Sequence, residues 1–342
     1  LGQVLPSGAV PMATLTPFPA RVPATGRASE IGEPRYDVMP TAEERQKAEE
    51  RPSSFQHDSR PEIDQPEGTD PTDPRVYAKA RENLDRLNAE GALCADDRAH
   101  YYLYRQIMGE HSQLGLVAVA SCAEYSDNTI RKHEFTRPAK EDDRVAHLEA
   151  LDAQTGPVFV TYPADAGLDE LFGRIASGEP DHDFTAPDGV QHTSWTVSSG
   201  EDAQFIASRF DAIPNLYIAD GHHRSAAAER VAERRAGSGT SGLFLTVLFP
   251  HNQMQILAYN RAVRDLNCQS PEAFPGALCL ALDTEESGLA KLRGKLELCS
   301  HRLRSWPPPL PTARSIATAV PINPLAVTLL PDLALNPLPP RL

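Results

Sequence analysis

The sequence lacks the features that mark disulfide-rich, zinc-binding and membrane proteins. Only five of its 342 residues are cysteines, and no two of them stand in a CxxC spacing. We therefore expect neither a disulfide framework nor a zinc ribbon, and isolated thiols of this kind are typical of the reducing cytoplasm. No apolar run is long enough to cross a membrane, and no basic segment followed by an apolar run opens the chain. A cytoplasmic protein without a signal peptide or a membrane partner is the expectation.

The motifs of the best-known nucleotide-binding and hydrolytic sites are also absent. The chain has no GxxxxGK[ST], GxGxxG or GxSxG segment, so P-loop, Rossmann and nucleophile-elbow mechanisms have no support. Basic residues are in deficit as well, because 33 Lys and Arg face 47 Asp and Glu, which leaves a net charge of -14. Such a field repels phosphate polymers, so nucleic acid is not an expected partner. A small nucleotide or metabolite held at a focused site remains compatible with this charge.

The overall amino-acid composition is that of a globular protein. Apolar residues make up 40% and charged residues 23%, which is enough for a sizeable core. Three regions are indicated: a leader at 1–12 that we expect to be disordered, an α/β region at 13–266, and a tail at 267–342 rich in proline and leucine. The density of proline after residue 305 sustains neither helices nor central strands. The tail is interpreted either as disordered or as the frame-shifted or misassembled end of a gene, and we favour the second.

Strands and helices alternate along the α/β region. Capping residues and apolar spacing predict helices that begin at 41 and 74, lie in the second half of 131–151, and span about 168–175, 201–210 and 225–236. Composition predicts a hairpin of 101–107 with 114–125, and strands at 158–162, 192–197, 216–219, 242–249 and 254–259. The segment 51–74 is predicted to be a long loop, either functional or a linker. This alternation indicates an α/β or mixed α+β fold.

The strongest local signal lies where a predicted strand gives way to a helix, at Asp220-Gly221-His222-His223-Arg224. A helix start presents unpaired N–H groups that suit a phosphate, and Gly221 lets the backbone approach a ligand closely. Arg224 can grip phosphate oxygens with two hydrogen bonds, and Asp220 can hold Mg²⁺ or accept a proton. The two histidines can donate hydrogen bonds or relay protons. The alternative is that Asp220 only caps the helix and the histidines are packed or solvated; we favour the functional interpretation.

A second group of charged residues runs from Lys132 to Arg144. Glu134 is a candidate general base or metal ligand, and Lys132, Arg137 and Lys140 are candidates for holding phosphates. Composition alone favours a solvated helix face laced by ion pairs. A functional interpretation of this segment therefore depends on its lying close to the glycine turn.

Taken in order, these motifs resemble those of a known family. The chain contains YDV at 36–38, SRPEID at 59–64, KHExTRxxKExDR at 132–144 and YIADGHHR at 217–224. This order is typical of the family catalogued as domain of unknown function 1015, and the similarity spans about residues 15–266. The chain departs from the family pattern at Pro34-Arg35, where the family has paired prolines, and after Asn267, where the tail replaces a globular continuation.

The glycine turn is also similar to that of the ParB/sulfiredoxin superfamily, in which a Gly-x-x-Arg turn at a helix start receives nucleotide phosphates. The resemblance implies a ParB/sulfiredoxin-like core around a strand–DGHHR–helix junction. It also implies phosphate contacts for Gly221, His222, His223 and Arg224, with Asp220 and His223 beside the transferring group. Glu134 would be the base that deprotonates an acceptor hydroxyl. Such a cluster can supply the positioning and the charge stabilisation that phosphoryl transfer needs.

Three functions remain open at this point. The leading hypothesis is a phosphotransferase that uses ATP or ADP, assisted by Mg²⁺, to phosphorylate a small hydroxylated metabolite such as serine. The second is a nucleotide-binding regulatory module without turnover. The third is a metal-dependent hydrolase with His133, His222 and His223 as ligands, which we rank last because these histidines lack a recognisable ligand spacing. The sequence assigns no oligomeric state.

Overall fold

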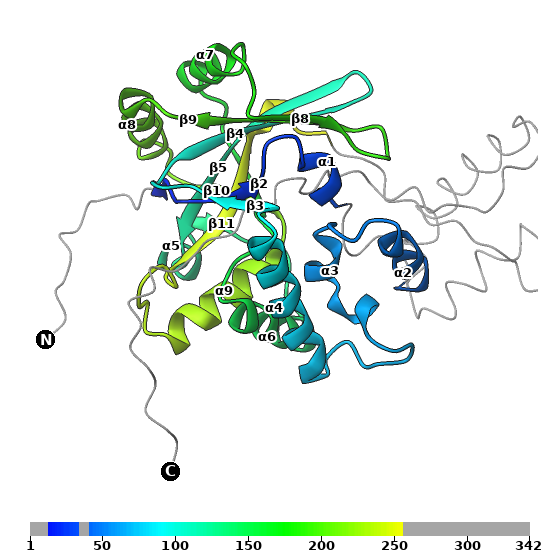
Figure 1. Cartoon of the computed structure of the whole chain (residues 1–342). Helices are drawn as coiled ribbons and strands as arrows, with labels where there is room; N and C mark the ends of the chain where they lie inside the picture. The colour runs from blue at the N-terminus through cyan, green and yellow to red at the C-terminus, as the bar shows by residue number, and fades with distance from the viewer. Residues whose placement is uncertain (1–12, 34–40, 256–342) are drawn as a thin grey trace, which may run out of the picture. The chain divides into compact units, whose positions relative to one another are not determined.

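One mixed sheet of nine strands dominates the described residues, 13–33 and 41–255 of a computed structural model (Figure 1). Its strands are β1 (Leu15–Thr16), β4 (Tyr101–Met108), β5 (His111–Ser121), β6 (Ile130–Arg131), β7 (Val158–Tyr162), β8 (His182–Thr185), β9 (Gln191–Val197), β10 (Leu216–Asp220) and β11 (Leu243–Pro250). A separate ribbon pairs β2 (Arg21–Pro23) with β3 (Leu93–Ala95). The expected leader, the motif at 36–38 and the tail lie outside the described residues. Of the strand predicted at 254–259 only residues 254 and 255 are described, and they are not in a strand.

The strand order in the sheet is β6-β10-β7-β11-β5-β4-β9-β8, with β1 also beside β5. β10 is parallel to β6 and β7 is parallel to β11, while the other neighbours are antiparallel. The middle strands β11 and β5 are buried along most of their length, as expected of strands that are covered on both faces. The predicted α/β class with mixed α+β character is confirmed.

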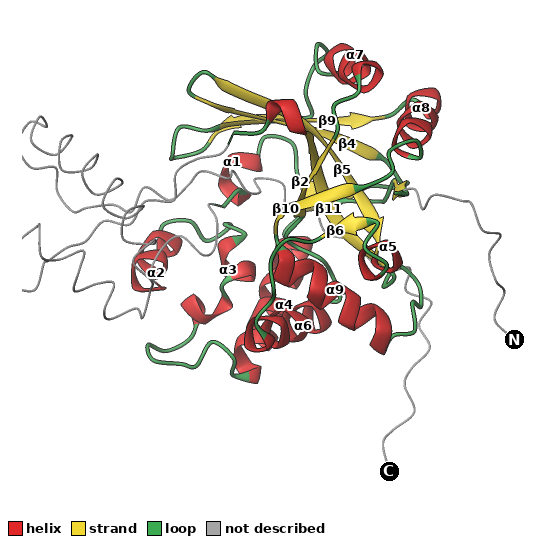
Figure 2. Ribbon diagram, turned by 180° about the vertical axis from the view of Figure 1, so that it is seen from behind, coloured by secondary structure: helices red, strands yellow, loops and turns green. Residues whose placement is uncertain are grey.

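The helices are α1 (Ala28–Ile31), α2 (Thr41–Glu49), α3 (Gln56–Ser59), α4 (Pro74–Ala89), α5 (Cys122–Ser126), α6 (Pro138–Leu151), α7 (Ala166–Ile175), α8 (Gly200–Phe210) and α9 (His222–Arg234). Two short 3₁₀ helices, η1 (Pro61–Asp64) and η2 (His251–Gln253), accompany them. Figures 1 and 2 show α7 and α8 near the top of the view and α4, α6 and α9 grouped at the bottom. No helix within the described ranges is long and apolar enough to span a membrane.

Helix α4 forms as its sequence predicts. Asp73 accepts a hydrogen bond from the N–H of Arg75 (2.9 Å), and Pro74 occupies the first helical position, where its missing N–H costs nothing. The apolar face of the helix is buried and consists of Val76, Ala80, Leu84 and Leu87. Leu84 and Leu87 form a cluster with Phe55 and Leu151, so α4 packs on α3 and α6.

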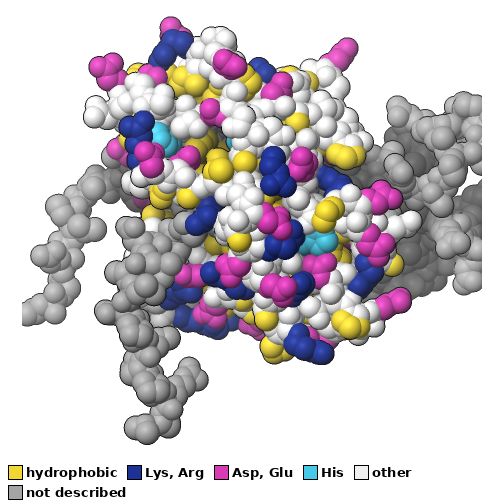
Figure 3. Space-filling model, viewed as in Figure 1, with side chains coloured by type: hydrophobic (Ala, Val, Ile, Leu, Met, Phe, Trp, Pro, Cys, Tyr) yellow, Lys and Arg dark blue, Asp and Glu magenta, His cyan; other side chains and the backbone are white. Residues whose placement is uncertain are grey.

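Helices α6 and α9 are held together by apolar and charged contacts. Val145 of α6 packs with Ala227 and Val231 of α9. Arg234 of α9 pairs with Glu149 of α6 (3.0 Å), and Figure 3 shows basic and acidic side chains interspersed over the lower part of the molecule, where these helices lie. Each of the two helices begins within one of the two charged motifs, so this contact brings the motifs close together.

Two predicted boundaries shift for local reasons. The strand predicted to reach residue 125 ends at Ser121, because the Ser121 hydroxyl accepts a hydrogen bond from the N–H of Ala123 (3.2 Å) and starts α5. The helix predicted from residue 225 already begins at His222, directly after Gly221.

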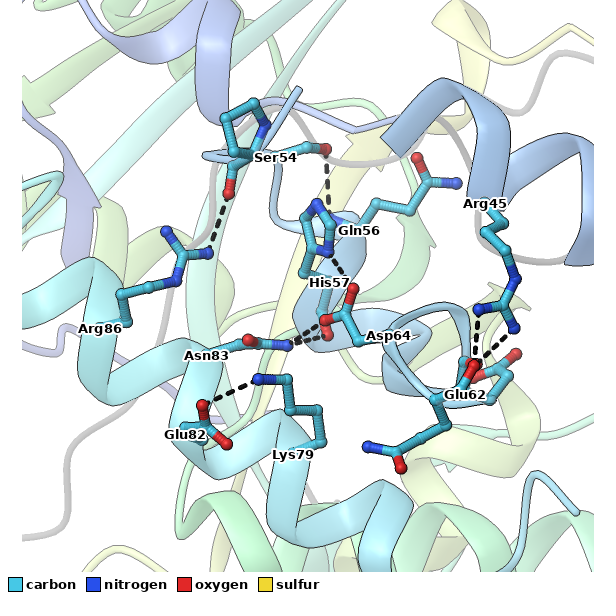
Figure 4. Close-up of polar contacts among 12 residues, drawn as sticks. Arg45, Ser54, Gln56, His57, Glu62, Asp64, Lys79, Glu82, Asn83 and Arg86 are labelled. Carbon is cyan, nitrogen blue, oxygen red and sulfur yellow. Dashed lines mark hydrogen bonds and ion pairs between the residues drawn. The ribbon is translucent and has the colours of Figure 1, made fainter. Parts of the chain in front are cut away.

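The predicted loop at 51–74 contains α3 and η1 and is an ordered part of the core (Figure 4). His57 Nδ1 lies 2.7 Å from Asp64 Oδ1, and Asn83 of α4 donates to Asp64 Oδ2 (2.7 Å) and to the carbonyl of His57 (2.8 Å). Arg45 of α2 donates to the Glu62 carbonyl (3.1 Å). These polar contacts run to α2 and α4, so the SRPEID motif fastens this segment to its neighbours, and the linker interpretation is not supported.

Candidate phosphate-binding site

The turn between β10 and α9 is shaped by a bulge and a left-handed residue. The pairing of β10 with β7 changes register between Ile218 and Asp220, which marks a bulge at the end of the strand. Gly221 follows with φ +94°, a conformation that glycine adopts without steric cost. The N–H of Arg224 then bonds to the Gly221 carbonyl (2.9 Å) and closes the first turn of α9. Strand end and helix start therefore meet in one tight turn.

The side chain of Arg224 folds back over this turn. Its Nη2 lies 3.1 Å from Asp220 Oδ2, and only 14% of the side chain is exposed. A β-carbon added to Gly221 would lie 3.1 Å from Arg224 Nε, and one added to Gly156 would lie 3.0 Å from its Nη1. The guanidinium group thus fits between two backbone positions that carry no side chain. Its planar fork suits the bidentate recognition of phosphate oxygens.

The segment before α6 docks on the two histidines of the turn. The backbone N–H of His133 donates to His222 Nε2 (3.4 Å), and the backbone N–H of Arg137 donates to His223 Nε2 (3.1 Å). The rings of His133 and His222 also meet edge to face, with centroids 4.4 Å apart. The structure therefore brings together the charged motifs at 132–144 and 217–224.

Both histidines of the turn favour the neutral form. Burial lowers the pKa of His222, and the neighbouring His133 lowers it further. Burial also lowers the pKa of His223, and Lys140 adds to that effect. Because Nε2 of each ring accepts a backbone N–H, the ring proton sits on Nδ1. In His222 this Nδ1 lies 3.6 Å from Glu134 Oε2.

Two helix starts lie side by side at this site, and neither carries a side-chain cap. α6 begins after Arg137 and α9 after Gly221, and neither of these residues has a side chain that accepts a hydrogen bond from the first turn of its helix. In contrast, α4, α5, α7 and α8 are capped by Asp73, Ser121, Asp165 and Ser199. The first N–H groups of a helix have no intrahelical partner and carry partial positive charge. At α9 these donors are the N–H groups of His222 and His223, because the N–H of Arg224 already bonds to the Gly221 carbonyl. At α6 the donor is the N–H of Ala139, since Pro138 has no N–H and the N–H of Lys140 bonds to the Arg137 carbonyl. N–H groups of this kind suit phosphate oxygens.

Basic side chains surround the same place. Lys132, Arg137 and Lys140 are exposed, and within residues 13–33 and 41–255 none of them forms an ion pair with a carboxylate. The ammonium group of Lys132 lies 3.9 Å from the centre of the Tyr125 ring, a cation–π contact that positions it. The acidic residues Glu141 and Asp142 of the same segment are paired with Arg230 of α9, which leaves the charges of these three basic side chains available in a chain with a net charge of -14.

The two carboxylates of the site have different surroundings. The side chain of Asp220 is 31% exposed and pairs with Arg224, whereas that of Glu134 is 59% exposed and reaches His222. Magnesium in phosphate sites is commonly held by one or two carboxylates together with the phosphates of the substrate, so Asp220 fits as one such ligand. In the described part of the chain, no group of three or more His, Cys, Asp or Glu is arranged to hold a metal ion. The residues thus fit a metal that arrives with a phosphate better than one held by the protein alone.

Two residues at this place are not apparent from the sequence. Gly156 lies against Arg224, but a glycine before a strand ordinarily indicates a turn. Phe135 is 99% exposed between His133 and Arg137, although phenylalanine is usually a core residue. Its position inside a charged segment is the one sequence feature that sets it apart.

The fold and the site define a mixed α/β protein whose candidate site is built where two uncapped helix starts meet an arginine-bearing turn. The chain belongs to the family described as protein of unknown function DUF1015, whose family model matches residues 15–302. The family resemblance is thereby confirmed, and the match continues past residue 266. No curated protein and no solved structure matches the chain.

Proposed function

We propose that the protein binds the phosphates of a nucleotide at the paired starts of α6 and α9 and transfers a phosphoryl group to a small hydroxylated metabolite such as serine. The observation that carries this proposal is the meeting of two uncapped helix starts, linked by the bond from the Arg137 N–H to His223. The similarity of the Gly-x-x-Arg turn to that of the ParB/sulfiredoxin superfamily supports the same assignment. The scattered cysteines support a cytoplasmic location.

In the proposed complex the phosphate oxygens accept hydrogen bonds from the N–H groups of His222 and His223 at α9, from that of Ala139 at α6, and from the guanidinium of Arg224. Lys132, Arg137 and Lys140 offset the negative charge of the phosphates. A Mg²⁺ ion bound with the nucleotide would supply further charge neutralisation, with Asp220 as its protein ligand. Positioning and charge stabilisation are the main requirements of phosphoryl transfer, and these side chains provide both.

Glu134 acts as the general base in this proposal, because its carboxylate lies on the docked loop beside His222. The acceptor hydroxyl loses its proton to Glu134 while its oxygen bonds to the terminal phosphorus. The bond from that phosphorus to the bridging oxygen breaks, which leaves ADP from ATP, or AMP from ADP. The Nδ1–H of His223 donates a hydrogen bond to the departing phosphate.

A nucleotide-binding module without turnover is the second candidate. It is favoured by the ion pair between Asp220 and Arg224, which engages one oxygen of the only carboxylate on the turn itself. The metal-dependent hydrolase gains less support, because Nε2 of His222 and Nε2 of His223 each already accept a backbone N–H.

Thermal unfolding with pyrophosphate, ATP, ADP and CTP, each with and without Mg²⁺, tests the binding step. A ligand that binds only the folded state raises the midpoint of unfolding by mass action. We expect a rise for the wild type, none for Arg224→Ala, and a normal rise for the matched control Arg234→Ala at the far end of α9. If the wild-type midpoint stays constant with every ligand, the proposal is wrong.

Turnover separates the two leading candidates. We expect formation of phosphoserine, or of another phosphorylated hydroxyl compound, from a panel of metabolites incubated with ATP or ADP. Glu134→Gln should lose this activity and keep nucleotide binding, while Glu149→Gln, at the other end of α6, should keep both. Binding without any product from the panel would favour the regulatory module.

A further inference from the structure

We propose that Phe135 stacks on the base of the bound nucleotide and forms a subsite that accepts any of the common bases. This inference rests on the proposed function, because it assigns the other end of the same nucleotide. Its starting observation is that Phe135 is 99% exposed, while every other phenylalanine of the described segments except Phe205 is buried or partly buried. A fully exposed aromatic side chain leaves its apolar surface in contact with water. A base stacked on the ring would bury that surface.

The position of Phe135 relative to the phosphate site is set by two hydrogen bonds. The backbone N–H groups of His133 and Arg137 donate to the two histidines at the start of α9. Phe135 is two residues from each of these anchors, and consecutive Cα atoms are about 3.8 Å apart, so its Cα lies within about 8 Å of both. A base is joined to its phosphates through one ribose. A nucleotide with its phosphates on the helix starts can therefore place its base against the Phe135 ring.

The chemistry of the ring predicts how selective this subsite is. A phenyl face offers no hydrogen bond to the edge of a base, and stacking is tolerant because every base has a π-face. We therefore expect ATP, GTP and CTP to bind with similar affinity, the larger purines somewhat more tightly. Tripolyphosphate, which has no base, should bind more weakly than ATP.

Dissociation constants measured by titration calorimetry test this proposal. ATP, GTP, CTP and tripolyphosphate would each be titrated, with Mg²⁺, into the wild type, Phe135→Ala, Phe135→Leu and Phe135→Trp. The control is Phe205→Ala, which removes the exposed phenylalanine of α8, 41% exposed. Loss of base stacking should raise the dissociation constant for ATP about 5- to 100-fold in Phe135→Ala. That for tripolyphosphate should not change, Phe135→Leu should be intermediate, and Phe135→Trp should bind ATP at least as tightly as the wild type.

The outcomes separate this inference from the function on which it rests. If the wild type binds tripolyphosphate and ATP, and Phe135→Ala leaves both dissociation constants unchanged, the base subsite is wrong and the phosphate site stands. If Phe135→Ala weakens both ligands equally, the ring supports the loop and does not stack on a base. If the wild type binds neither ligand, the proposed function and the subsite fail together.

Discussion

A single added methyl group beside Arg224 tests the role of this arginine without changing it. In Gly156→Ala the new β-carbon would lie 3.0 Å from Arg224 Nη1 and 3.2 Å from its Cδ, so the side chain must shift. Gly156 is not among the residues with positive φ, so alanine adds no backbone strain. We expect the free energy of unfolding to change by less than about 1 kcal/mol. A hydrogen bond to a charged group contributes about 1.5–3 kcal/mol, so its loss should weaken phosphate binding by about 10- to 100-fold.

Gly221→Ala disturbs the same guanidinium from the other side. Its β-carbon would lie 3.1 Å from both Nε and Nη2 of Arg224, and the left-handed backbone at φ +94° adds strain. Such strain costs about 1–2 kcal/mol for a residue with a β-carbon. The matched control is Gly237→Ala after the end of α9, where φ is +65° and no atom lies within 4 Å of the added carbon. Both variants should lose similar stability, but only Gly221→Ala should also lose phosphate affinity.

Two measurements test whether the placement of Arg224 governs phosphate affinity. Urea unfolding gives the free energy of unfolding of each variant, and calorimetric titration with pyrophosphate and Mg²⁺ gives its affinity. The reasoning predicts weak binding by Gly156→Ala and Gly221→Ala and normal binding by Gly237→Ala. If all three variants bind pyrophosphate equally well, the placement of Arg224 does not govern affinity, and its assignment to the phosphate is refuted.

Three further predictions concern the stability of the fold. Burial raises the pKa of Glu33 to about 8, above its ordinary value of 4.5, so the folded state retains a proton that the unfolded chain releases. Stability should therefore fall by up to about 5 kcal/mol as pH rises from the ordinary to the raised pKa, and Glu33→Gln should flatten this fall in urea titrations. Burial lowers the pKa of His147 from 6.5 to about 4, so stability should fall as pH drops through that window. In His147→Gln the free energy of unfolding should decrease less steeply with falling pH. An unchanged pH dependence would contradict this prediction. Leu87→Ala, in the core between α4 and α3, should cost about 2–5 kcal/mol in denaturant unfolding. Phe205→Ala, which removes a side chain that is 41% exposed, should cost about 1–2 kcal/mol. Equal losses would contradict the assigned core.

The elements that could be predicted from the sequence carry their own local signals. Helix α4 has a capping aspartate and a proline at its start, and its apolar residues recur at helical spacing. The hairpin of β4 and β5 has β-type composition on both sides of a turn. The junction at Asp220–Arg224 was recognisable because a glycine followed by a histidine pair and an arginine separates a strand from a helix. In each case the information lies within a few neighbouring residues.

The elements that could not be predicted depend on distant contacts. The segment 51–74 has the composition of a loop, yet Phe55 and Ile63 are buried, and Asn83 of α4 holds the segment through hydrogen bonds. Composition describes the segment alone, whereas the surface that buries it belongs to a helix later in the chain. The roles of Gly156 and Phe135 could not be predicted for the same reason. The role of Gly156 depends on its contact with Arg224, and that of Phe135 on its exposure beside the histidines of α9.

The meeting of the two charged motifs follows from helix packing. Val145 of α6 and Val231 of α9 belong to one apolar cluster, so the hydrophobic contact that stabilises the helix pair also brings the starts of the two helices together. Neither motif alone predicts that the two lie close together, because the apolar residues that pack the helices lie downstream of each charged segment. An isolated 132–144 segment is consistent with a solvated face, and its interpretation changes only once α9 lies beside it.

The same packing changes the chemistry of the histidines. Exposed imidazoles beside an aspartate and a glutamate would be protonated more readily and could not accept hydrogen bonds at both positions. Burial lowers the pKa of His222 and of His223, so each ring keeps a lone pair on Nε2 that holds a backbone N–H of the neighbouring loop. One nitrogen of each ring is thereby used to assemble the site, and the other presents an N–H. Hydrophobic packing thus determines which atoms of the charged motifs are available to a ligand, and that selection is the link between this fold and its proposed function.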